Sequence, residues 1–77
     1  MNKQRRAQLQ DIITRLEIIS EDLESLRDEE DDYRDNIPEN LQGSEKYENS
    51  ENASYSMDEA IDNISSAVDS INEAIDY

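Results

Sequence analysis

Residues 9–26, LQDIITRLEIISEDLESL, decide the fold of this chain, because residues 57–75, MDEAIDNISSAVDSINEAI, repeat their pattern. In both stretches apolar residues recur at alternating spacings of three and four, which is the heptad pattern of a coiled coil. The apolar residues of the first stretch are Leu9, Ile12, Leu16, Ile19, Leu23 and Leu26. Those of the second stretch are Met57, Ile61, Ile64, Val68, Ile71 and Ile75. The sequence therefore predicts an all-α fold, an antiparallel two-helix coiled-coil hairpin.

The expected register follows from folding the chain back about Asn40. The two stripes then meet in layers whose residue numbers sum to 80, so that Leu9 faces Ile71. Each layer joins an a position to a d position, as an antiparallel coiled coil requires. The d positions of the first helix are Ile12, Ile19, Leu26 and Tyr33. The same register places Leu26 opposite Ser54, which predicts weaker apolar packing toward the turn, where only Tyr33 opposite Tyr47 restores an apolar layer.

The whole chain, residues 1–77, is expected to form one domain whose first helix covers about 3–35. Pro38 ends this helix, because proline has no backbone N–H to donate and pushes the preceding residue away from helical geometry. The turn is expected over 36–43.

The second helix is expected over 57–76, where Ser56 and Glu59 form a capping box at its start. Residues 48–56 are rich in Asn and Ser, which favour caps and turns over helix interiors. Ser44 is also a suitable N-cap residue, so an earlier start at that position stays open.

Composition restricts how this hairpin is stabilised. A chain of 77 residues with no Cys has no disulfide, and a single core of this size rarely supplies more than ~3–5 kcal/mol. A second copy or a partner is therefore expected to cover the open flank. The sequence contains neither a secretory signal nor a run of ~18 apolar residues, so we expect a cytoplasmic protein with no membrane partner.

Charge is the second strong feature: 21 Asp and Glu against 7 Lys and Arg give a net charge of -14. Residues 17–59, which we call the tip half, hold 16 acids and 3 bases, a net of -13. The remaining residues, the terminal half, hold 5 acids and 4 bases. Such a balance repels nucleic acid and attracts basic surfaces, including those that bind nucleic acid.

A partner-binding surface is predicted where the acids are densest, on the helix before the turn. Calcium loops place carboxylates around a glycine turn, whereas these residues fan around a helix, so neither a metal nor another cofactor is expected. No adjacent nucleophile or apolar pocket indicates catalysis, so the protein is not expected to be an enzyme. A merely solvated acidic face is the alternative. The predicted partner-binding residues are Asp28, Glu29, Asp31, Asp32, Asp35 and the exposed aromatic Tyr55.

A possible dimer surface is predicted beside the apolar stripes, through which two copies would form a four-helix bundle. Two isoleucines fall at e and c of the first helix, and three alanines fall at successive g positions of the second. Isolated surface isoleucines and alanines chosen for helix propensity are the alternative explanation. These residues are Ile13, Ile18, Ala60, Ala67 and Ala74.

Three parts of the chain carry a resemblance to known proteins: the run Arg27-Asp28-Glu29-Glu30, the turn NIPENLQGSE at residues 36–45, and the DEAID heptads that follow. Together they resemble short acidic helical-hairpin proteins of phages and mobile elements of Firmicutes. The resemblance implies a setting, an accessory gene of a mobile element, and no assigned activity. In that setting small acidic proteins are often inhibitors of host defence nucleases, of the anti-CRISPR or anti-restriction type.

Two functions are therefore expected as alternatives. The first is a non-enzymatic inhibitor that mimics nucleic acid and binds a basic nucleic-acid-binding protein, such as a defence nuclease, without contacting nucleic acid itself. The second is a homodimeric structural or adaptor coiled-coil protein.

Overall fold

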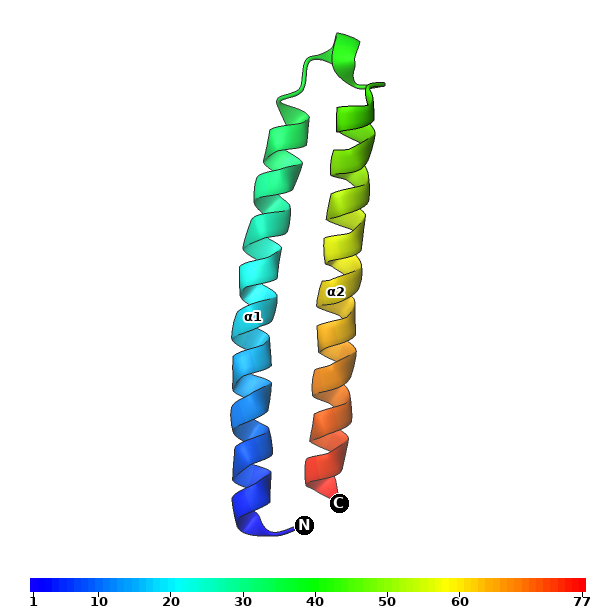
Figure 1. Cartoon of the computed structure of the whole chain (residues 1–77). Helices are drawn as coiled ribbons and strands as arrows, with labels where there is room; N and C mark the ends of the chain where they lie inside the picture. The colour runs from blue at the N-terminus through cyan, green and yellow to red at the C-terminus, as the bar shows by residue number, and fades with distance from the viewer.

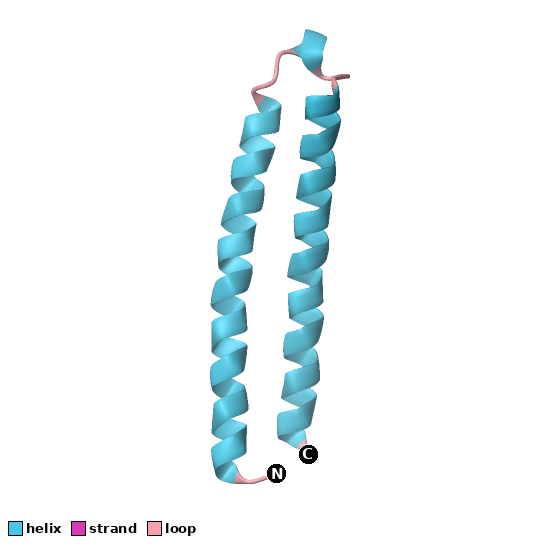
Figure 2. Ribbon diagram, viewed as in Figure 1, coloured by secondary structure: helices cyan, strands magenta, loops and turns pink.

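The chain folds into two long antiparallel helices joined at one end (Figure 1). In the computed structural model, which describes residues 1–77, α1 spans Lys3–Asp35 and α2 spans Glu45–Asp76. The two termini lie together at the end of the rod opposite the turn, and the molecule contains no strand (Figure 2). The rod measures 60 × 15 × 12 Å. The all-α hairpin predicted from the heptads is confirmed.

Helix α1 has a capped start and a defined end. The side chain of Asn2 accepts a hydrogen bond of 2.7 Å from the backbone N–H of Arg5, which satisfies one of the free donors of the first turn. At the other end, the Asn36 side chain donates a 2.9 Å hydrogen bond to the carbonyl of Asp32. Pro38 follows in extended conformation, so the helix cannot continue.

Helix α2 starts at the earlier of the two positions that the sequence allows. After the short 3-10 helix η1, Glu39–Leu41, the Ser44 hydroxyl accepts a 3.3 Å hydrogen bond from the backbone N–H of Tyr47. This N-cap begins the helix at Glu45, and the Asn- and Ser-rich segment 48–56 is helical. The two helices are therefore nearly equal in length, with 33 and 32 residues.

Helix α1 meets α2 through a different face from the one that the heptad frame predicted. Ile13, expected outside the contact, is the most buried apolar side chain of the protein, with 2% of its surface exposed. Ile19, expected inside it, is 49% exposed, and Leu26 and Tyr33 are exposed as well. The predicted d positions of α1 are thus wrong. The inward row of α1 comprises Leu9, Ile13, Leu16, Ser20, Leu23, Arg27, Glu30 and Arg34.

The register is also shifted. Five residue pairs form side-chain hydrogen bonds between the helices, and their residue numbers sum to 80, 84, 85, 85 and 88. Only the pair Glu30 and Ser50 matches the predicted sum of 80, while Ser54 bonds Asp31 and Arg34 instead of facing Leu26. The average offset is about four residues, or roughly one helical turn.

The hairpin buries very little. Ile13 is its one buried apolar side chain, because two helices can cover each other on one side only. The molecule exposes 5792 Å², whereas a compact protein of 8.9 kDa would expose roughly 4,800 Å². An excess of roughly 1,000 Å² therefore remains in contact with solvent.

We predict that Ile13→Ala lowers the free energy of unfolding by about 2–4 kcal/mol, because it opens a cavity at the best-packed position of the hairpin. Ile18→Ala is the matched control, since Ile18 is 53% exposed and lies on the outer side of α1. Its effect should stay within about 0.5 kcal/mol. Urea unfolding followed by circular dichroism compares the two variants, and equal losses would contradict the observed face.

Candidate partner-binding surface

The acidic residues gather at the end of the rod that carries the turn. The tip half holds a net charge of -13 and lies opposite the two termini (Figure 1). Asp28, Asp32 and Asp35 follow one another at spacings of four and three, so they lie on one side of α1 at intervals of roughly 5–6 Å. Glu29 lies one residue round the helix from Asp28. All four are exposed.

The other two predicted residues are placed differently from this row. Asp31 is half-buried and turned toward α2, where it takes part in interhelical hydrogen bonds. Tyr55 lies on α2 with its ring exposed. The structure thus brings together four of the six predicted residues on one side of α1.

Asp31 belongs to a polar layer between the helices, formed with Arg34, Glu30, Ser50 and Ser54. Arg34 donates hydrogen bonds of 2.8 Å to Asp31 and to the Ser54 hydroxyl, and one of 3.2 Å to the Ser50 carbonyl. The Ser54 hydroxyl donates to Asp31 at 2.7 Å, and the Ser50 hydroxyl donates to Glu30 at 2.6 Å. Both serines are buried, and no buried side-chain polar atom of the molecule lacks a partner.

These contacts stabilise the charged form of Asp31 in the folded protein. The hydrogen bond from Ser54, followed by that from Arg34, holds the pKa of the Asp31 carboxyl below its ordinary value. In turn, the hydrogen bond to Asp31 raises the pKa of Arg34. Asp31 thus accepts two hydrogen bonds inside the hairpin, which sets it apart from the exposed acids of α1.

Arg27 forms a second link between the helices. Its guanidinium donates to Asp58 on α2 at 2.8 Å and to neighbouring Asp28 at 3.2 Å, and these two hydrogen bonds raise the pKa of Arg27. The third base of the tip half, Lys46, lies over the ring of Tyr33 with its Nζ 5.8 Å from the centroid. Arg27 and Arg34 are thus engaged within the hairpin, and the exposed acids of α1 outnumber the cations beside them.

An apolar hollow next to the turn is a feature that the sequence did not predict. Tyr33, which the heptad frame placed inside the hairpin, instead lines this hollow together with Ile37, Pro38 and Leu41. Leu41 is half exposed. The available signal was the presence of three apolar residues in a turn that is otherwise polar.

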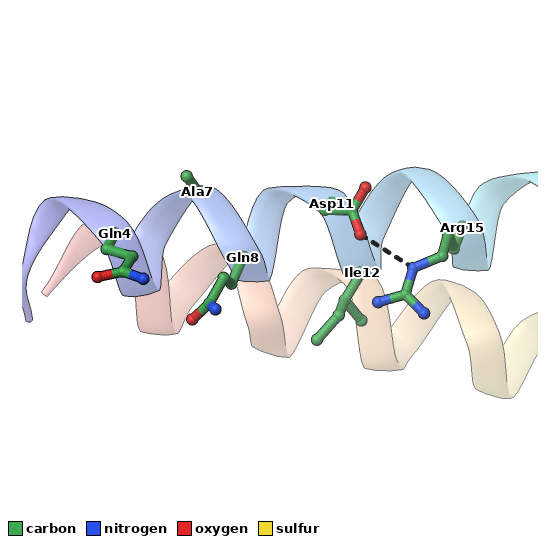
Figure 3. Close-up of a pocket in the computed structure, with 6 residues that line it drawn as sticks. All are labelled: Gln4, Ala7, Gln8, Asp11, Ile12 and Arg15. Atoms are coloured by element: carbon green, nitrogen blue, oxygen red, sulfur yellow. Dashed lines mark hydrogen bonds and ion pairs between the residues drawn. The ribbon is translucent and has the colours of Figure 1, made fainter.

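A second hollow lies near the termini and is formed by α1 residues (Figure 3). Arg15 and Asp11 join there through a 3.1 Å ion pair, and Gln8 and Ile12 lie beside it. No group of three or more acidic side chains anywhere in the chain converges closely enough to hold a metal ion. Neither helix is long and apolar enough to cross a membrane.

We predict that Asp31→Asn destabilises the hairpin at neutral pH and that the difference from the unmodified chain disappears in acid. Because the folded-state pKa of Asp31 lies below its ordinary value of 3.8, its contribution is present above that pH and is lost as the pH falls through the folded-state pKa. Thermal unfolding at neutral pH and below pH 3.8 measures the difference.

The control is Asp32→Asn, which removes the same charge from an exposed neighbour outside the polar layer. It should leave stability unchanged or raise it slightly, since like-charge repulsion falls. A loss at Asp32 as large as that at Asp31 would show that net charge alone matters.

Comparison with known proteins adds no family to this description. No protein-family model matches the chain, and neither curated proteins nor solved structures gave a match. The resemblance to acidic proteins of mobile elements therefore stays an expectation from the sequence.

Proposed function

We propose that this protein is a non-enzymatic inhibitor that binds the nucleic-acid site of a basic protein by presenting its acidic tip in place of nucleic acid. The observation that carries this proposal is the density of charge in the tip half. In that role the chain needs no catalytic group of its own, because it acts by occupying a site.

The net negative charge per unit length of the tip half approaches that of DNA. The part of α1 within the tip half, residues 17–35, is roughly 28 Å long at 1.5 Å per residue. Residues 17–35 and the neighbouring residues 45–59 of α2 together hold 15 acids and 3 bases over that length, which is one net charge per roughly 2.3 Å, against one per ~1.7 Å of duplex DNA. A groove lined with Lys and Arg would attract both by the same electrostatics.

The arrangement of the tip favours a surface that a partner can reach. Asp28, Asp32 and Asp35 occupy successive turns of α1 on an exposed side, and Glu29 lies beside them. The interhelical hydrogen bonds of Arg34 hold it away from this row, and Arg27, which links to Asp58, contacts the row at Asp28 alone. A partner approaching from the outer side of α1 therefore meets carboxylates first.

The apolar hollow at the turn supplies a second kind of contact. Charge attracts a partner and orients it, while affinity comes mostly from a few buried aromatic and apolar anchors. Leu41, which is half exposed in this hollow, can serve as such an anchor.

The target class follows from the expected setting. Accessory genes of mobile elements benefit from blocking enzymes that cut foreign DNA, and such enzymes hold DNA in basic grooves. We therefore propose a restriction or CRISPR nuclease as the partner, contacted by protein alone.

The test is DNA cleavage by a panel of purified restriction endonucleases and CRISPR nucleases with and without the protein. We predict that the full chain inhibits at least one of them and that added salt weakens the inhibition. A tip variant, Asp28→Asn with Glu29→Gln, Asp32→Asn and Asp35→Asn, should raise the concentration for half-inhibition by about tenfold or more.

The matched control removes four charges from the terminal half: Asp62→Asn, Asp69→Asn, Glu73→Gln and Asp76→Asn. It changes net charge equally but leaves the tip intact, so inhibition should persist nearly unchanged. Equal loss in both variants would reduce the effect to net charge, and the absence of inhibition across the panel would refute the proposed target class.

A further inference from the structure

A row of apolar residues on α1 is left largely uncovered by α2. Its members recur every seven residues, so they form one stripe that turns only ~20° around the helix axis with each heptad. Ile19 is 49% exposed, and its neighbours in the row are exposed or half-buried. We call this the outer stripe; it comprises Ile12, Ile19, Leu26 and Tyr33.

A row of alanines on α2 faces the same way. It comprises Ala53, Ala60, Ala67 and Ala74, again seven residues apart, and Lys46 occupies the preceding position of the same row. Because Lys46 lies over the ring of Tyr33, the alanine row and the outer stripe share one face of the hairpin. That face is apolar, and small side chains on half of it permit close approach.

The other face is polar. Asp58 is two residues from Ala60, and therefore about 200° round α2 from the alanine row. Its hydrogen bond to Arg27 and the one between Ser54 and Asp31 lie on this side of the contact between the helices. The hairpin as a whole is thus amphipathic, with one broad face suited to burial.

The side of the rod that carries these two rows is large enough for a stable dimer interface. It measures 60 × 15 Å, or roughly 900 Å², with the rows along about 32 Å of its length, and standard interfaces bury ~800 Å² on each partner. The hairpin also exposes roughly 1,000 Å² more than a compact protein of its mass. Burying this one face would remove the excess.

The two rows also share a midpoint. The outer stripe is centred between Ile19 and Leu26, four to five residues from Arg27 toward the N-terminus. The alanine row is centred between Ala60 and Ala67, five to six residues beyond Asp58. On the average register of the five hydrogen-bonded pairs, the two centres differ in height by roughly 2–3 Å. A single two-fold axis across the rod can therefore pass close to both.

Repulsion between the two acidic tip halves favours a dimer whose tips lie at opposite ends. With the tips at opposite ends, the net charge of -13 on each tip half lies about half of the 60 Å rod away from its counterpart. That distance is several times the ~8 Å Debye length at physiological salt. Each tip then lies beside the basic residues of the other copy's terminal half: Lys3, Arg5, Arg6 and Arg15.

We propose that the partner of this face is a second copy of the chain, packed face to face with its tip at the opposite end. Around the two-fold axis, Ile19 of one copy meets Leu26 of the other, and Ile12 meets Tyr33. The alanine rows pack against each other in the same way, Ala60 with Ala67. This surface differs from the one that the heptad frame indicated, because Ile13 is buried inside the hairpin and Ile18 faces outward. The proposal does not depend on the proposed inhibitor function.

Sedimentation over a concentration series tests the dimer with two neighbouring substitutions that leave the net charge unchanged. Ile19→Gln should raise the dimer dissociation constant by about tenfold or more, because it places an amide at the centre of the interface. Ile18→Gln, at a site of 53% exposure against 49%, should have little effect. An unmodified chain that stays monomeric throughout, or a larger effect of Ile18→Gln, would overturn the proposal.

Two further measurements keep the test decisive if Ile19→Gln folds poorly. The unfolding temperature of the unmodified protein should rise with its concentration, as mass action requires for a dimer, and a constant value would count against one. Because the chain contains no Cys, Asn40→Cys places one spin label at each tip. A label-to-label distance near the 60 Å length of the rod supports opposite tips, whereas half that length or less overturns the orientation.

Discussion

The polar layer around Arg34 determines which face of α1 meets α2. Helix α1 has two faces that share Leu9, Leu16 and Leu23, and the face richer in Ile and Leu is the one left outside. The reason lies on α2, which presents Ser50 and Ser54 within its inward row. Facing these hydroxyls with Leu26 and Tyr33 would leave buried polar atoms unpaired, at a cost of roughly 1–3 kcal/mol each. Arg34, Asp31 and Glu30 satisfy both serines instead.

The orientation of α1 near the turn fixes its orientation along the whole helix. Residues seven apart keep nearly the same orientation, so facing Arg34 inward also faces Arg27, Ser20 and Ile13 inward. Only Ile13, at the far end of this row, is apolar, which explains why the best-buried side chain lies in the terminal half. The outer stripe is exposed for the same reason. Because the row that contains Arg34 is turned toward α2, the apolar residues of the outer stripe face solvent. A monomeric hairpin therefore satisfies its hydrogen bonds at the expense of apolar burial.

Much of the architecture could be predicted from the sequence, because heptads and a proline turn leave few alternatives to a hairpin. Hydrophobicity alone assigns the wrong face of α1. The two candidate faces share half of their residues, and the more apolar of the two is the natural assignment. The start of α2 was ambiguous for a related reason. Serines in segment 48–56 compete with a helix when their hydroxyls bond the local backbone, but Ser50 and Ser54 donate across to α1. Two serines four residues apart, opposite the charged run that contains Glu30, Asp31 and Arg34, were the usable signal.

The candidate binding residues could be predicted as a group but not one by one. An acidic run on a helix has members on every side, so some of them must face the other helix, and Asp31 does. The hollow at the turn was not predictable, because it depends on Tyr33 being displaced from the contact between the helices.

The acidic row and the apolar face use different sides of the rod, and this separation follows from the same polar layer. Asp28 contacts Arg27, which reaches Asp58 on the polar face, whereas Tyr33 and Lys46 mark the apolar face. A second copy packed on the apolar face would therefore leave exposed the side of α1 that carries Asp28, Asp32 and Asp35. Because its tips would lie at opposite ends, such a dimer would present two acidic surfaces separated by about half of the 60 Å rod. Dimerisation and binding of a basic partner are thus compatible on this fold, since neither surface is needed to complete the other.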